Sequence, residues 1–271
     1  MSSTPVQLVT PALSPSRKAT FTDVLLSEWT KIRTLRSTFF SLAVAVAIAV
    51  GLGTLISYES GIHYRASQGP WDPTATSLGA LMIGQLAIAV LGVLTITGEY
   101  STGMVRTTLA AVPRRGRLLA TKAAVFTGVA LVTGEVLSWA AFALGQMVMH
   151  GHAPTAALSQ PGVARAVLGA GLYVALIGLM AVAIGTLLRH TAGAIVSVFA
   201  LLFVLPGVLE ALPASWRNPV EKYWPTNAGS QVLEVTRASH TLSAWLGFGE
   251  FALFVALLLG LAFWLLQRRD A

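Results

Sequence analysis

The chain alternates between long apolar runs and short polar segments, a pattern typical of proteins that cross a membrane several times. A helix needs about 20 apolar residues to cross a hydrocarbon core of about 30 Å. Six runs meet this length, near Thr38–Ser57, Thr76–Thr97, Leu118–Val148, Val163–Leu187, Thr191–Leu212 and Ser243–Leu266. The sequence therefore predicts an all-α fold with six transmembrane helices, in a domain that covers residues 38–271.

A polar region precedes the first span. Residues 1–19 are rich in proline and polar residues, which predicts a disordered cytoplasmic tail. Residues 20–37 predict an amphipathic interfacial helix, because Thr20 and Asp23 have the spacing of a capping box. A simple pre-span segment is an equally good interpretation. The apolar face of the helix comprises Phe21, Leu25, Trp29 and Ile32.

The loop between the second and third spans, residues 98–117, combines a short amphipathic stretch with a basic turn. Apolar residues from Met104 to Leu109 fall on one side of a short predicted helix, which Pro113 ends. The arginines that follow could dock a partner, or they could only fix the topology. The charges of this region are Glu99, Arg106, Arg114, Arg115, Arg117 and Lys122.

The distribution of Lys and Arg predicts the orientation in the membrane. If both termini lie inside, thirteen basic residues fall on the inner side and five on the outer side. Since basic residues concentrate on the cytoplasmic side, we expect the N- and C-termini to be cytoplasmic. The longest outer segment, 213–241, is rich in aromatic residues suited to membrane anchoring or to an exit path, and its part Gln231–Arg237 predicts a short helix.

Composition supports a membrane protein and argues against an enzyme. The chain is 55% hydrophobic and only 11% charged, and its net charge of +7 lies at the ends of apolar runs, which favours lipid over nucleic acid as a partner. It contains no cysteine, no P-loop and no recognised hydrolase motif, so we expect neither catalysis, nor a cofactor, nor a metal site.

Two carboxylates, Glu135 and Glu250, lie well inside predicted spans. A charge in mid-bilayer costs at least about 2.5 kcal/mol, so such residues usually face protein or water. They could line a translocation path or a proton-coupled site. They could equally be protonated and bonded to a neighbouring helix.

Three segments resemble one family. The loop ITGEYSTGMVRTTLAAVPRRGRLLATK is similar to the first cytoplasmic loop of ATP-binding-cassette exporter permeases of the second type. The segment LLSEWTKIRTLRSTFF resembles the entry helix of small six-span actinobacterial members, and KYWPTNAGSQV resembles an outer segment of the same group.

The resemblance implies a permease subunit in the bacterial plasma membrane that pairs with a second copy or a related chain. Separate ATPase subunits would drive it, which agrees with the missing P-loop. By position, the segment that contacts the ATPase would run from Glu99 to Arg106, with Glu99 and Gly103 at the matching motif positions. Arg114 and Arg115 would stand at its far edge.

Two other functions remain open at this point. An ion-gradient-driven secondary transporter would use coupled acids, for which only Glu135 and Glu250 are available. A non-transporting immunity or scaffold subunit could recruit a partner through the same basic loop. The sequence does not identify a cargo.

Overall fold

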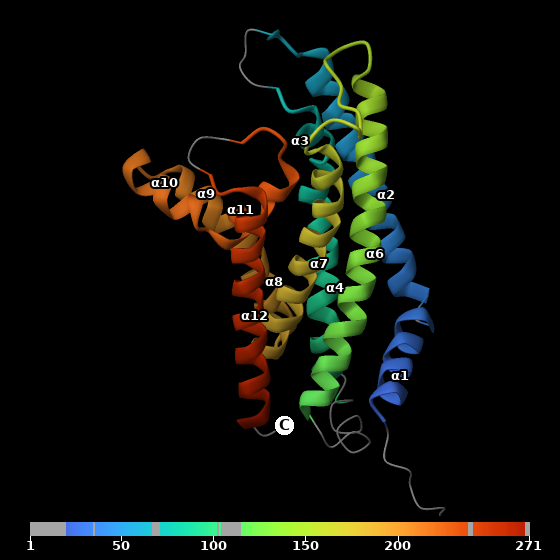
Figure 1. Cartoon of the computed structure of the whole chain (residues 1–271). Helices are drawn as coiled ribbons and strands as arrows, with labels where there is room; N and C mark the ends of the chain where they lie inside the picture. Colours follow the sequence, from blue (N-terminus) through green and yellow to red (C-terminus); the bar gives the residue numbers. More distant parts are fainter. Residues whose placement is uncertain are drawn as a thin grey trace, which may run out of the picture.

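A computed structural model describes residues 20–34, 36–66, 71–101, 103, 115–237 and 241–268. Every regular element among these residues is helical (Figure 1). The helices are α1 (Phe21–Thr34), α2 (Arg36–Ile62), α3 (Pro73–Ser77), α4 (Ala80–Ser101), α6 (Arg115–Met149), α7 (Val163–Leu188), α8 (Thr191–Phe199), the π-helical turn η2 (Ala200–Val204), α9 (Leu205–Glu210), α10 (Ala214–Lys222), α11 (Pro225–Ser230), the 3₁₀ turn η3 (Gln231–Leu233) and α12 (Ala244–Arg268).

Six helices in the described part of the chain are long and apolar enough to cross a membrane. They confirm the predicted all-α, six-span fold. They are Leu42–Ile62, Ala80–Tyr100, Gly116–Met149, Val163–Leu188, Thr191–Glu210 and Ala244–Arg268.

The predicted start of the second span is wrong. Thr76 belongs to the separate short helix α3, and the chain turns at Leu78 and Gly79 before α4 begins. The cause is local, since Asp72 caps α3 by accepting hydrogen bonds from the backbone N–H groups of Thr74 and Ala75, and Pro73 supplies a favourable first residue.

The spans alternate in direction, so the bundle has two distinct ends (Figure 1). The α1 end holds α1, the end of α4, the start of α6 and the end of α12. The α3 end holds α3, α10 and α11. Both ends of the described chain therefore lie at the α1 end, the arrangement that a six-span protein with both termini cytoplasmic requires.

Helix α7 forms the centre of the bundle. In the most apolar 18-residue stretch of its span 78% of the residues are buried, compared with 17% in the spans of α2, α8–α9 and α12. Helix α7 packs against α4, α6 and α12, and its small residues permit close approach. At the α6 crossing, a Cβ atom on Gly134 would lie 2.9 Å from the carbonyl oxygen of Gly171. At the α4 crossing, a Cβ atom on Gly92 would lie 2.8 Å from the carbonyl oxygen of Gly178.

Side chains that bind backbone groups hold the α3 end together. Asp72 Oδ2 accepts hydrogen bonds of 2.8 and 2.9 Å from the N–H groups of Val235 and Thr236, 163 and 164 residues away. Arg165 of α7 donates to the carbonyl oxygens of Val232 and Glu234. Burial raises the pKa of the Glu234 carboxyl, and the negative charge of Asp72 raises that pKa further.

The predicted helix over Gln231–Arg237 is also wrong. Only Gln231–Leu233 form a 3₁₀ turn, and the chain then becomes extended at Glu234. The backbone N–H groups of residues 235 and 236 bind Asp72 instead of continuing a helix. Helical structure in this segment lies earlier, in α10 and α11.

The close crossing of α6 and α7 predicts a sharp difference between two glycines of α6. Gly134→Ala would place its methyl group 2.9 Å from the Gly171 carbonyl oxygen, so we expect the free energy of unfolding to fall by about 1–3 kcal/mol. Gly128→Ala meets nothing within 4 Å and is the matched control, expected to raise it by about 0.5–1 kcal/mol because alanine favours a helix more than glycine does. Thermal unfolding of both purified variants in detergent would test this, and equal midpoints would contradict it.

Candidate functional site

The first helix begins where its capping residues predict. The backbone N–H of Thr20 donates to Asp23 Oδ2 at 2.8 Å, and the N–H of Asp23 donates to Thr20 Oγ1 at 3.3 Å. This reciprocal pair is a capping box with aspartate in place of glutamate. It fixes the register of α1, and in that register Glu28 is buried against the bundle.

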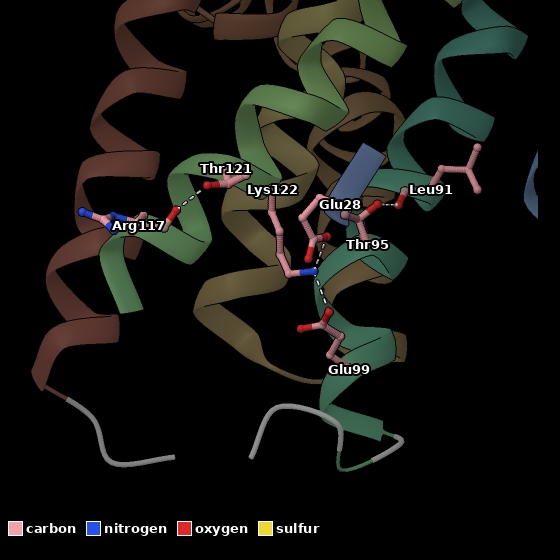
Figure 2. Close-up of polar contacts among 7 residues, drawn as sticks. All are labelled: Glu28, Leu91, Thr95, Glu99, Arg117, Thr121 and Lys122. Carbon is pink, nitrogen blue, oxygen red and sulfur yellow. Dashed lines mark hydrogen bonds and ion pairs between the residues drawn. The ribbon is translucent and has the colours of Figure 1, made fainter. Parts of the chain in front are cut away.

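Glu28 is one of three charged side chains that meet at the α1 end. The ammonium group of Lys122 in α6 lies 2.9 Å from Glu28 Oε2 and 2.6 Å from Glu99 Oε1 in α4 (Figure 2). The exposed fractions of the Lys122, Glu28 and Glu99 side chains are 5%, 6% and 14%. We call these three residues the charged triad. They join three helices that are separated by up to 94 residues of sequence.

The position of Lys122 explains why it needs partners. It lies in the second turn of α6, inside an apolar helix that otherwise packs as a membrane span. An uncompensated charge buried there would cost several kcal/mol, whereas attraction to two carboxylates offsets that cost. Lysine suits this task because its ammonium carries three donors on a flexible stem, so it can bind both acids at once.

Two further contacts lie close to the triad along the sequence. The guanidinium of Arg189, which ends α7 in a left-handed conformation, lies 5.5 Å from the centre of the Tyr100 ring. Gly103 follows α4 with a φ of +71°, and its N–H donates to the Tyr100 carbonyl oxygen. A Cβ at Gly103 would meet nothing, so the backbone conformation is what favours glycine there.

No protein-family model matches this chain. No curated protein matches it either. What the α1 end can do therefore follows from its own residues and their surroundings.

The predicted coupling residues fall into two groups. Glu99 and Gly103 lie at the end of α4, and Glu99 belongs to the charged triad. Arg115 is the first residue of α6, and its side chain is outside the described residues. Arg106 and Arg114 also lie outside the described residues, as does the predicted short helix of this loop.

The predicted apolar face of α1 turns away from the bundle. Phe21 and Trp29 are largely exposed and Leu25 is half-buried, while the side chain of Ile32 is outside the described residues. Exposed aromatic residues on a helix whose acid faces inward suit contact with lipid headgroups. The position of α1 relative to a bilayer stays a prediction.

Glu135 and Glu250 lie apart from the triad. The Glu135 carboxyl packs against Gly171 of α7, and its Oε2 is buried with no hydrogen-bond partner among the described residues. Glu250 is half-buried in α12 beside the fully buried Phe251. Within the described chain no hydrogen bond or ion pair joins the two glutamates, so a role in a translocation path stays a prediction for both.

Sequence reasoning did not assign Glu28, Tyr100 or Arg189 to this site, and it counted Lys122 only as a loop charge. One signal was present: Lys122 lies within a predicted apolar span, where a charged residue requires a partner. The sequence could not indicate which of the available acids would supply it.

The triad predicts an asymmetric response to neutralising its charges. Lys122→Met leaves two carboxylates buried side by side, so we expect the free energy of unfolding to fall by about 3–5 kcal/mol. The triple variant Glu28→Gln, Lys122→Met and Glu99→Gln removes all three charges, and we expect it to recover most of that loss. Thermal unfolding in detergent measures both, and a Lys122→Met protein as stable as wild type would contradict this assignment.

Proposed function

We propose that the chain is the membrane-spanning permease subunit of an ATP-binding-cassette exporter. Separate ATPase subunits would drive it through the cytoplasmic loop 98–117. The charged triad is the observation that best supports this function. It places a rigid polar junction where α4 enters that loop and α6 leaves it.

The ion pairs of the triad connect the loop to three helices, so a partner bound to the loop could move all three. Glu99 lies two residues before the end of α4, and Lys122 lies seven residues after the start of α6, so their ion pair links the two flanks of the loop. The second ion pair adds α1 through Glu28. A displacement of the loop would therefore act on three helices together and would not bend one of them alone.

The mechanism would be a shift between two populations. ATP binding draws the ATPase subunits together, and the energy of that contact favours one packing of the spans over another. The chain's own part is to convert movement at the loop into movement of the helices. Close crossings such as that of α4 and α7 suit this role, since tightly packed helices move as units.

One observation favours an ion-driven transporter as the alternative. Glu135 lies inside a span, and an ionisable residue there is a candidate site of proton exchange. Such a protein would work without an ATPase, so the two functions give different results in the same purification.

Affinity purification of the tagged full chain from its native cells in mild detergent tests the proposal. We expect an ATP-hydrolysing protein to co-purify with the wild-type chain. Reversing two loop charges, Arg114→Glu and Arg115→Glu, should reduce its recovery about tenfold, because each reversal replaces attraction to the partner with repulsion.

A matched control reverses two charges near the α3 end, Arg65→Glu and Arg217→Glu, and should leave the recovery unchanged. Thermal unfolding shows whether each variant keeps its fold. A wild-type chain that purifies without ATPase activity would contradict the proposal. So would a loop variant that retains the full amount of the partner.

A further inference from the structure

The α3 end contains a cavity that the proposed coupling does not use. Its volume is about 380 Å³, within the range of about 300–1,000 Å³ typical of small-molecule sites. It opens between the fifth span, α4 and the segment from α10 to the start of α12. The residues of the fifth span and α4 that line it are Met82, Leu202, Phe203, Pro206, Gly207 and Glu210.

The opposite wall is polar and carries most of the charge. It is formed by Glu221, Lys222, Asn227, Ser230, Gln231 and Glu234. With Glu210, three carboxylates face one ammonium group. Glu221 lies 3.9 Å from Arg217, and Lys222 lies over the Tyr223 ring, whereas no ion pair within the described chain involves Glu210 or Glu234.

The apolar wall depends on an irregular turn. The fifth span contains the π-helical turn η2, which presents Leu202 and Phe203 to the cavity. Trp224 Nε1 donates at 3.2 Å to the carbonyl oxygen of Leu201 within this turn, which ties the polar segment to the span. Turns of this kind interrupt a span at a cost in regular hydrogen bonding and occur frequently at functional sites.

An unpaired acceptor lies on α4, next to the cavity residue Met82. Gln85 is 2% exposed, and its Oε1 has no hydrogen-bond partner among the described residues. Its Nε2 lies 3.7 Å from the sulfur of Met82, which lines the cavity. A buried amide oxygen without a donor is costly, and its partial negative charge lies next to the Met82 side of the cavity.

We propose that this cavity binds an amphipathic organic cation. The apolar wall would hold the body of the ligand, and Glu210 and Glu234 would attract its positive charge. Such a ligand is the cargo class of the pump only if the proposed function holds, whereas the binding itself does not depend on an ATPase.

Equilibrium dialysis of the purified full chain in lipid nanodiscs tests the cavity. The probe is tetraphenylphosphonium, and empty nanodiscs correct for its partition into lipid. Tetraphenylborate has nearly the same shape and the opposite charge, so it isolates the effect of charge. We expect saturable binding of the cation, at one site per chain, and none of the anion.

Three variants locate the site. The double variant Glu210→Gln and Glu234→Gln keeps the side-chain shapes and should weaken binding about tenfold, equivalent to about 1.4 kcal/mol. Gly207→Leu places a side chain in open space at the cavity and should abolish binding. Gly260→Leu meets equally open space on α12, away from the cavity, and should bind like wild type.

Three results would each overturn the inference: no saturable binding of the cation, equal binding of the anion, or wild-type affinity in the glutamine double variant. The cavity and the exporter function can be rejected independently of each other. Binding without a co-purifying ATPase would leave the cavity assigned and the exporter function rejected. Co-purification of an ATPase without cation binding would support the exporter function and reject the cavity as a cation site.

Discussion

The fold at the α1 end depends on one buried ammonium group. Lys122 cannot remain charged inside an apolar helix unless acids accompany it, and the two that do lie 94 and 23 residues away in the sequence. The requirement is mutual, because Glu28 and Glu99 are themselves largely buried. Lys122 of α6 thus binds the acids of α1 and α4 at the same time. These ion pairs fix the relative positions of α1, α4 and α6 more specifically than apolar packing between lipid-facing helices does.

Different kinds of contact hold the helices together at the two ends of the bundle. At the α3 end, Asp72 and Arg165 bind backbone groups, so their contacts depend on the course of the chain and not on partner side chains. At the α1 end, side chain meets side chain, and the contacts are ionic. Between them the helices meet through small residues around α7, where an added Cβ atom would contact the neighbouring backbone. The polar contacts that fix the positions of the helices therefore lie mainly at the two ends of the bundle.

Much of the fold follows from the sequence because apolar runs of span length are a strong signal. The same holds for the start of α1, where Thr20 and Asp23 form their predicted box. The failures have a common cause. Glu28 faces inward and binds Lys122, which lies 94 residues away in the sequence. Likewise, Gln231–Arg237 has a helical pattern, but the carboxylate of Asp72 captures its N–H groups. Local periodicity carries no information about contacts made across more than 90 residues.

Helix α4 connects the two candidate sites. It carries Glu99 of the triad near one end and Met82 of the cavity wall near the other, about 26 Å apart at 1.5 Å per residue. Its middle is pressed against α7, where Gly92 approaches the Gly178 backbone too closely for the helix to bend there without loss of packing. Under the proposed function, a push on the loop would therefore reach the cavity through α4 as a rigid rod. A coupled pump needs this connection, whereas a scaffold subunit would have no use for it.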